Sequence, residues 1–262
     1  MKKNEFEKIK ALLIDLDGTV YFKDQAIAGA ADTINYLRDI GITLRFLTNT
    51  DAKPSKYILN RINGYGLNIS IDEIHTPVSA SVKFMKSRES KSFYPLVSLE
   101  VLPEYEGMNV NEEKVDYVII GDFRERVNYQ TMNKAFRLIS SGAEIIALQK
   151  GKYFYNEEGK NIDTGAFVKL FEYASDKEAM VMGKPSKDFF KVVLHELNLK
   201  PEEVAIIGDD ITTDILGAKQ LGAMAILVKT GKYNDNNIEK YSEIEPDLIL
   251  DTFTDIARYI VR

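Results

Sequence analysis

The sequence of 262 residues contains no cysteine and only two histidines. The lack of cysteine excludes disulfide bonds, thiolate nucleophiles and the zinc or iron–sulfur centres that use cysteine ligands. Two histidines are too few for a metal centre built from several imidazoles. A metal ion bound by this chain would therefore be a hard cation with oxygen ligands, such as Mg²⁺.

Long hydrophobic runs are also missing. The first ten residues (MKKNEFEKIK) are rich in charge, and the apolar run after them ends at Asp15, which is too short for a signal-peptide core. No run reaches the ~20 apolar residues that span a bilayer. The 40 acidic residues outnumber the 34 basic ones and give a net charge of −6, which disfavours binding to a nucleic-acid backbone. We therefore expect a cytoplasmic protein with neither membrane nor nucleic-acid partners.

Short apolar runs alternate with helical patterns in both end regions of the chain. Strand-like runs lie at 11–15, 43–49, 204–209, 224–228 and 247–250, and helical patterns lie at 28–41, 55–66, 186–197 and 213–222. Strands that are apolar throughout are typical of a parallel sheet covered by helices on both faces. The sequence thus predicts an α/β fold with a doubly wound parallel sheet, in which ligands bind at the carboxyl ends of the strands.

The middle of the chain has a pattern of its own. Three more strand-like runs lie at 93–98, 116–121 and 144–149, with helical patterns at 128–142 and 164–175 and a tyrosine-rich, turn-rich stretch at 152–161 that suggests a hairpin. We expect this block to form a separate small α/β domain. The predicted organisation is a core domain of residues 1–88 and 181–262, interrupted by a cap domain of residues 89–180.

The first candidate site is the segment Asp15-Leu16-Asp17-Gly18-Thr19, at the end of the first predicted strand. Gly18 allows a turn that can bring the carboxylates of Asp15 and Asp17 to one point. One carboxylate can attack a phosphoryl group and form an aspartyl-phosphate. A second can protonate the leaving oxygen and then activate water. The alternative is a plain strand end, since Asp and Gly are common in turns.

Carboxylates also gather at the end of the predicted strand 204–209. The segment Gly208-Asp209-Asp210 lies there, and Asp214 follows four residues later, near the start of a helix. Such a cluster suits a hard divalent cation. For Asp214 the open alternative is an N-terminal helix residue that the helix dipole stabilises.

Two further segments carry groups that can hold phosphate oxygens. Thr48-Asn49-Thr50 follows the second predicted strand and offers a hydroxyl and backbone N–H groups. Lys184 stands between Gly183 and Pro185 ahead of a helix, where its charge can neutralise a phosphate. The alternatives are a helix-capping loop for the first segment and a solvated lysine for the second.

In this order the four segments resemble the four motifs of the haloacid dehalogenase superfamily of phosphohydrolases. The segments TVYFKDQAIAGA, LTNT, MGKPS and GDDITTDILGAKQLG fit its subfamily IIA, which includes UMP phosphatase-like and 4-nitrophenylphosphatase-like enzymes. The resemblance covers nearly the whole chain. It implies a Rossmann-like core domain, and it identifies the block between Thr48 and Lys184 with the larger α/β cap (C2 type) of that subfamily.

The resemblance also implies roles in catalysis and in substrate binding. Asp15 is the expected nucleophile, and Asp17 is the expected general acid/base. Thr48, Asn49 and Lys184 are expected to bind the phosphoryl group that is transferred.

The same resemblance implies a bound Mg²⁺. Its expected ligands are Asp15, the backbone carbonyl of Asp17, and Asp209. Asp214 is expected to orient the water around the metal, with Asp210 beside it.

The predicted function is Mg²⁺-dependent hydrolysis of a small-molecule phosphate monoester. Three alternatives remain: a phosphotransferase or phosphomutase that uses the same site, a phospho-acceptor signalling protein, and an inactive binding protein. Receiver domains, which are phospho-acceptors, are about half this length. The inactive protein ranks last because every required side chain is present.

Discrimination between substrates is expected from the cap, because the core motifs reach only the phosphoryl group. The expected specificity segment is 161–165, where Asp163 and Thr164 stand next to Gly165, a residue that permits close approach of a ligand. The charge of Asp163 would disfavour polyanionic substrates. The alternative is that Asp163 or Thr164 simply caps the following helix. Capped members of the subfamily often form homodimers through the cap, so a homodimer is also left open.

Overall fold

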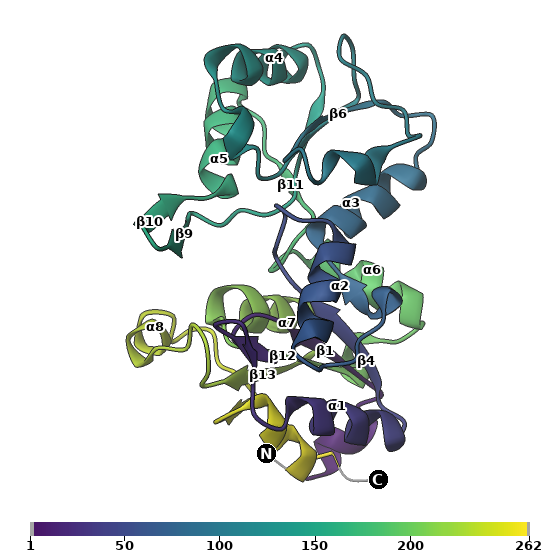
Figure 1. Ribbon diagram of the computed structural model, residues 1–262, viewed down its shortest axis with the longest axis vertical. Helices are drawn as coiled ribbons and strands as arrows, with labels where there is room; N and C mark the ends of the chain where they lie inside the picture. The colour runs from purple at the N-terminus through teal and green to yellow at the C-terminus, as the bar shows by residue number, and fades with distance from the viewer. Residues whose placement is uncertain (1–2, 261–262) are drawn as a thin grey trace. The chain divides into compact units, whose positions relative to one another are not determined.

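The structure is a computed structural model that describes residues 3–260, except for the side chains of 3–5, 155, 156 and 237. The chain divides into two compact units (Figure 1). Unit 1 contains the chain up to Thr48, Lys56–His75 and the chain from Lys184 onward. Unit 2 contains Asn49–Ser55 and Thr76–Gly183.

Unit 1 is built on a parallel sheet of six strands in the order β14-β13-β12-β1-β4-β5. The strands are β1 (Ala11–Asp15), β4 (Thr43–Leu47), β5 (Ile74–His75), β12 (Val204–Gly208), β13 (Met224–Val228) and β14 (Leu248–Leu250). Every residue of β1 and β12 is buried, as expected for central strands covered on both faces. The predicted parallel α/β sheet is confirmed.

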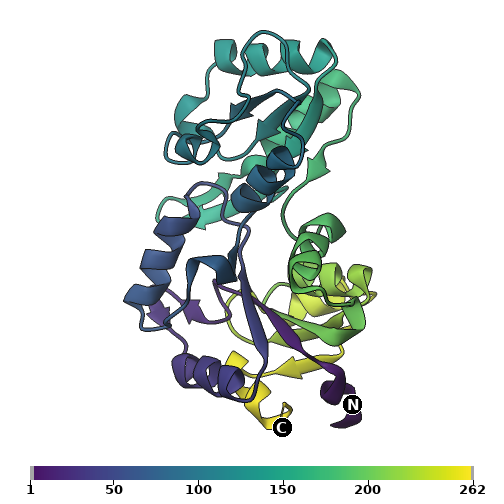
Figure 2. The same ribbon diagram turned by 90° about the vertical axis from the view of Figure 1, so that its right-hand side faces the viewer.

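The helices of unit 1 cover both faces of this sheet. They are α1 (Ala30–Asp39), α2 (Ser55–Gly64), α6 (Lys187–Leu197), α7 (Leu216–Leu221) and α8 (Asp235–Lys240). In Figure 2, α1 and α2 (blue) lie on one side of the sheet, and α6 and α7 (green) lie on the other. Leu12 and Ile14, two positions apart on β1, pack in one core with α1 and α2, because alternate side chains of a strand point to the same face.

Short helical turns complete unit 1. They are the 3₁₀ turns Lys3–Lys8, Ile71–Glu73, Pro201–Glu203 and Phe253–Arg258 and the π-helical turn Ile211–Ile215. A two-stranded antiparallel hairpin, β2 (Tyr21–Phe22) and β3 (Gln25–Ala26), follows the Asp15–Thr19 segment. None of the helices in the described part of the chain is long and apolar enough to cross a membrane.

Unit 2 has its own parallel sheet, in the order β11-β8-β7-β6. Its strands are β6 (Phe93–Leu96), β7 (Tyr117–Ile120), β8 (Glu144–Ala147) and β11 (Met180–Val181), and its helices are α3 (Pro77–Lys86), α4 (Tyr129–Ser140) and α5 (Thr164–Ser175), with 3₁₀ turns at Leu102–Tyr105 and Arg124–Arg126. The stretch at 152–161 forms the hairpin β9 (Tyr153–Asn156) and β10 (Gly159–Ile162). Apolar side chains of α4 and α5 share one core with β6, β7 and β8.

The limits of unit 2 differ from the expected cap of residues 89–180. Unit 2 takes in α3, because this helix packs on neighbours from the same unit: the Ser81 and Tyr105 hydroxyls are hydrogen-bonded at 2.7 Å, and the Phe84 ring meets the Tyr117 ring edge-on. At the other end, β11 pairs with β8 and keeps the chain in unit 2 up to Gly183.

Candidate active site

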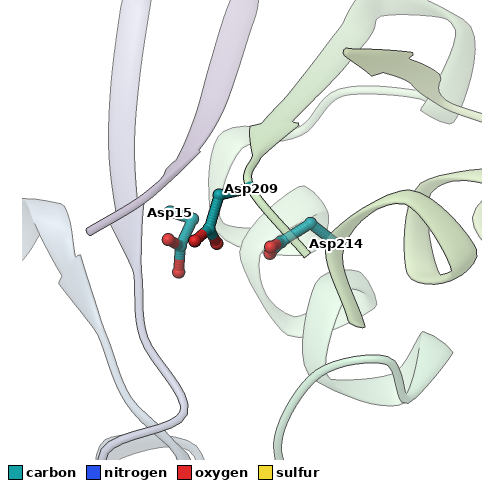
Figure 3. Close-up of side chains that lie close together, drawn as sticks. All are labelled: Asp15, Asp209 and Asp214. Carbon is teal, nitrogen blue, oxygen red and sulfur yellow. The ribbon is translucent and has the colours of Figure 1, made fainter. Parts of the chain in front are cut away.

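Three buried carboxylates of unit 1 converge at the carboxyl ends of its strands. Asp15 is the last residue of β1, Asp209 directly follows β12, and Asp214 lies in the π-helical turn 211–215. Each residue is at most 7% exposed, and their carboxylate oxygens lie within 4.8 Å of one another (Figure 3). β1 and β12 are parallel neighbours, with Ile14 beside Ile207, so the residues that follow them meet at one edge of the sheet.

Lys184 joins two of these carboxylates. Its buried ammonium donates a hydrogen bond to Oδ1 of Asp15 and another, of 2.7 Å, to Oδ1 of Asp214. Burial alone would lower the pKa of Lys184, but the charges of the two carboxylates outweigh burial and raise it. Lys184 therefore stays a cation inside the site. The alternative of a solvated lysine is wrong.

The charges in the cluster are unbalanced. Burial raises the pKa values of Asp209 and Asp214, and the neighbouring negative charges, that of Asp15 among them, raise both further. Lys184 is paired with two of the three carboxylates, Asp15 and Asp214, and all the ligand atoms that the three offer are oxygens. A hard divalent cation is the group that such a donor set fits, because it would offset the excess negative charge.

Asp17 lies on a tight turn just beyond β1. The N–H of Gly18 donates to the carbonyl of Tyr21 at 2.7 Å, and Gly18 has φ +85°, a conformation that glycine adopts without strain. Asp17 is exposed and is not part of the carboxylate cluster. Although the residue as a whole is exposed, protein around its carboxyl group displaces water and raises its pKa, and the negative charge of Asp15 raises that pKa further. A raised pKa suits a group that must donate a proton.

Thr48 directly follows β4, the other neighbour of β1. It is buried, and its N–H donates to the carbonyl of His75 at 3.1 Å. Leu47 lies beside Asp15 in the sheet, so Thr48 emerges at the same edge as the carboxylates. Asn49 is the first residue of unit 2, and its role in phosphate binding stays a prediction.

Asp210 is occupied by structural contacts. Its Oδ1 accepts hydrogen bonds from the N–H (2.9 Å) and the hydroxyl (2.7 Å) of Thr212, and its Oδ2 lies 3.3 Å from the Lys232 ammonium. Burial would raise the pKa of Asp210, but Lys232 and Thr212 outweigh it, and the pKa is lowered. Asp210 thus caps the helical turn that carries Asp214, and its carboxylate is not in the cluster.

In unit 2, the expected specificity segment caps helix α5. Oδ1 of Asp163 accepts hydrogen bonds from the N–H of Thr164 (2.8 Å) and from the Gln149 amide (2.9 Å). The buried Thr164 hydroxyl donates to Oδ2 of Asp51 at 2.8 Å. A role of Asp163 and Thr164 in specificity stays a prediction.

Gly165, which follows Thr164, is expected from the sequence to permit close approach of a ligand, and the structure shows a different contact there. Gly165 lies against backbone rather than open space: a Cβ at this position would come within 2.4 Å of the Lys150 carbonyl. The close approach that Gly165 permits is therefore that of the loop before β9, with the Gly165 N–H bonded to the carbonyl of Gly151 at 2.9 Å.

Some contacts at the site were not expected from the sequence. The Thr19 hydroxyl donates to Oδ2 of Asp15 at 3.1 Å. The Thr230 hydroxyl donates to the carbonyl of Gly18, and the Lys232 N–H donates to Oδ2 of Asp209 at 2.6 Å. A signal for Thr230 and Lys232 exists, because both lie in the short loop after β13, which ends at Val228, and residues after parallel strands gather at the ligand-binding edge.

Comparison with known proteins gives the family. A model described as haloacid dehalogenase-like hydrolase matches residues 12–111, and a related HAD-hydrolase-like model matches residues 181–256. The chain is 37% identical to haloacid dehalogenase-like hydrolase domain-containing protein 2 of Mus musculus, over 97% of this chain and 96% of the relative. It is also 37% identical to the phospholysine phosphohistidine inorganic pyrophosphate phosphatase of Xenopus laevis, over 91% of this chain and 90% of the relative.

Solved structures with a similar fold point to the same family as the relatives in sequence. The p-nitrophenyl phosphatase from Archaeoglobus fulgidus superposes with a TM-score of 0.89 at 25% identity, over 96% of this chain and 99% of that one. NagD from E. coli K-12 superposes with a TM-score of 0.86 at 27% identity, over the same shares of the two chains. The resemblance predicted from the four motifs is thus confirmed, and the chain belongs to the haloacid dehalogenase-like hydrolase family.

Proposed function

We propose that the protein is a Mg²⁺-dependent phosphatase that hydrolyses a small-molecule phosphate monoester through an aspartyl-phosphate on Asp15. The observation that carries the proposal is the bond between Asp15 and the buried Lys184, beside Asp209 and Asp214, in a chain of this family. A carboxylate fixed by a cation and surrounded by further oxygen ligands is suited to attack a phosphoryl group. The Xenopus relative and the Archaeoglobus structure are both named phosphatases, which supports this activity.

The proposed reaction has two steps. An oxygen of Asp15 forms a bond to phosphorus while the bond to the leaving oxygen breaks, and Asp17 gives that oxygen its proton. Water then attacks the phosphorus of the aspartyl-phosphate, Asp17 takes the proton of the water, and the bond to Asp15 breaks. The products are an alcohol and inorganic phosphate, and both aspartates return to their starting states.

The remaining residues of the proposed site would bind the phosphoryl group and the metal ion. Lys184 would neutralise the transferring phosphoryl group, with Thr48 and Asn49 donating hydrogen bonds to its oxygens. Asp15, Asp209 and the carbonyl of Asp17 would hold Mg²⁺, with Asp214 ordering water around it. When bound, Mg²⁺ would reduce the repulsion between the anionic nucleophile and the anionic substrate.

Removal of magnesium tests this proposal directly. We expect the protein to release phosphate from 4-nitrophenyl phosphate, to lose this activity in excess EDTA, and to regain it when Mg²⁺ is restored. Phosphate released over many turnovers distinguishes a hydrolase from a phospho-acceptor, which takes up one phosphate per chain. Full activity in excess EDTA would contradict the metal assignment. A panel that adds pyrophosphate, phosphohistidine and phospholysine, the compounds in the name of the Xenopus relative, would then rank substrates.

The cap segment gives a prediction about that ranking. Asp163→Asn removes a charge but keeps an oxygen that can accept the Thr164 N–H, so helix α5 stays capped. If Asp163 faces the leaving group, relative kcat/KM should shift toward anionic substrates by on the order of fivefold, the effect of about 1 kcal/mol. The melting temperature should change little. Asp176→Asn, at the other end of α5, is the control for loss of charge. An unchanged ranking would leave Asp163 with the capping role alone.

A further inference from the structure

A short loop after β13, Thr230–Lys232, contacts two segments of the candidate active site. The Thr230 hydroxyl donates to the carbonyl of Gly18, within the turn that carries Asp17. The Lys232 N–H donates to Oδ2 of Asp209 at 2.6 Å. The loop therefore ties the turn after β1 to the carboxylate after β12, although it contributes no carboxylate to the cluster.

Two glycines make room for the Asp209 carboxylate. Gly18 and Gly231 both have positive φ, +85° and +60°. An ideal Cβ on Gly18 would lie 2.1 Å from Oδ2 of Asp209, and one on Gly231 would lie 2.0 Å from the same oxygen. Each Cβ would also press on the Cα of the other glycine, at 3.0 and 2.6 Å. The carboxylate thus fits only because both flanking residues lack a side chain.

The bond to Lys232 also limits how Asp209 can act. Because Oδ2 lies against the two glycines and accepts the Lys232 N–H, the side chain is fixed in one orientation. Oδ1 makes no such bond to the loop, so the loop leaves one oxygen of Asp209 to meet a cation. The Lys232 ammonium is exposed and lies 3.3 Å from Oδ2 of Asp210, so its ion pair is with Asp210 and not with Asp209. The backbone N–H of Lys232, rather than its ammonium, therefore fixes the orientation of the Asp209 carboxylate.

We propose that Thr230–Lys232 is a positioning segment that presents one oxygen of Asp209 to magnesium and holds the Gly18 turn in register with it. The inference rests on the proposed function for the identity of the cation. Thr230 and Gly231 are positioning residues, because they act through Gly18 and Asp209. Metal affinity is therefore the property that they control.

Two substitutions test the segment. Gly231→Ala pushes a methyl group against Asp209, and Thr230→Val removes the hydroxyl that holds Gly18. The readout is the Mg²⁺ dissociation constant, measured by calorimetry on the substrate-free protein. We expect Gly231→Ala to weaken Mg²⁺ binding by at least tenfold and Thr230→Val to weaken it severalfold, whereas Thr230→Ser, which keeps the hydroxyl, should restore most of the affinity.

Gly66→Ala is the matched control. Gly66 has φ +83°, and nothing lies within 4 Å of an ideal Cβ at that position, so alanine there brings the backbone strain without a contact to Asp209. It should lower the melting temperature in EDTA while keeping the wild-type affinity for Mg²⁺. If Gly231→Ala does not fold, the pair of Thr230 variants decides.

Failure of this inference differs from failure of the proposed function. Wild-type Mg²⁺ affinity in both Gly231→Ala and Thr230→Val would overturn the positioning role and leave the phosphatase proposal standing. A wild-type protein that binds Mg²⁺ but hydrolyses no phosphate ester would overturn the proposed function. The Mg²⁺ affinities of the variants would still show whether Thr230–Lys232 positions Asp209. A wild-type protein that binds no Mg²⁺ would overturn the inference, whatever its turnover in EDTA.

Discussion

Asp15→Asn should abolish turnover, with a loss on the order of 10⁴- to 10⁶-fold, as is typical when a nucleophile is removed. An amide does not form an acyl-phosphate, so no intermediate can build up. The fold should survive, because asparagine has nearly the same shape and its oxygen can still accept a hydrogen bond from Lys184 or Thr19. Magnesium affinity should fall only in part, since the two other proposed ligands, Asp209 and the carbonyl of Asp17, remain. Release of phosphate, calorimetry with Mg²⁺ and the melting temperature measure the three properties.

Asp247→Asn is a suitable control for the loss of Asp15. Asp247 precedes β14 and accepts the Ala225 N–H at 2.8 Å, at the opposite edge of the same sheet. It should retain the turnover of the wild-type protein. If Asp15→Asn retained more than about a thousandth of wild-type turnover, with deamidation excluded by mass spectrometry, Asp15 would not be the nucleophile.

Asp17→Asn should also be severe, with a loss of roughly 10²- to 10⁴-fold, because both protonation of the leaving oxygen and activation of water fail. The loss should depend on the leaving group. 4-Nitrophenolate leaves readily without a proton, so the first step suffers less with 4-nitrophenyl phosphate than with an alkyl phosphate. The measurement is kcat/KM for both substrates in the variant and in the wild-type protein.

Asp24→Asn separates this effect from a general change of surface charge. Asp24 is an exposed carboxylate in the turn of the β2–β3 hairpin, where it pairs with Arg61. Its loss should affect the two substrates equally and weakly. If Asp17→Asn hydrolysed an alkyl phosphate at a near-normal rate, or lost the same factor on both substrates, the assignment of Asp17 as general acid would be refuted.

Much of the fold could be predicted because the central strands are apolar throughout. The runs 11–14, 204–207 and 224–228 in β1, β12 and β13 are continuously apolar and are followed by a glycine or a charged residue, which is typical of a parallel sheet, whereas β4 also contains Thr43 and Arg45. The same logic predicted that Asp15, Thr48 and Asp209 lie at one edge. The contacts of Lys184 could not be derived this way, because the sequence does not show where a side chain after β11 points.

Other features depend on tertiary contacts that no local pattern encodes. The hairpin β2–β3 has strands of two residues, too short for any periodicity to show. Helix α3 joins unit 2 because of Tyr105 and Tyr117, which follow it in the chain by many residues. The loop Thr230–Lys232 carries no carboxylate and no glycine-rich fingerprint, and its role depends on a backbone N–H, a group that every residue except proline has.

The order of the strands in the sheet of unit 1 determines when each strand gains its neighbours during synthesis on the ribosome. β1 lies between β4 and β12, so one of its neighbours is made early and the other only after the whole of unit 2. Unit 2 has all the strands of its sheet once Val181 has emerged, whereas Asp15 must wait for Asp209 and Asp214. On the proposed function, the nascent chain would be inactive until Asp214 has emerged, and until then the apolar β1 lacks its neighbour β12 and would be a segment for chaperones to protect.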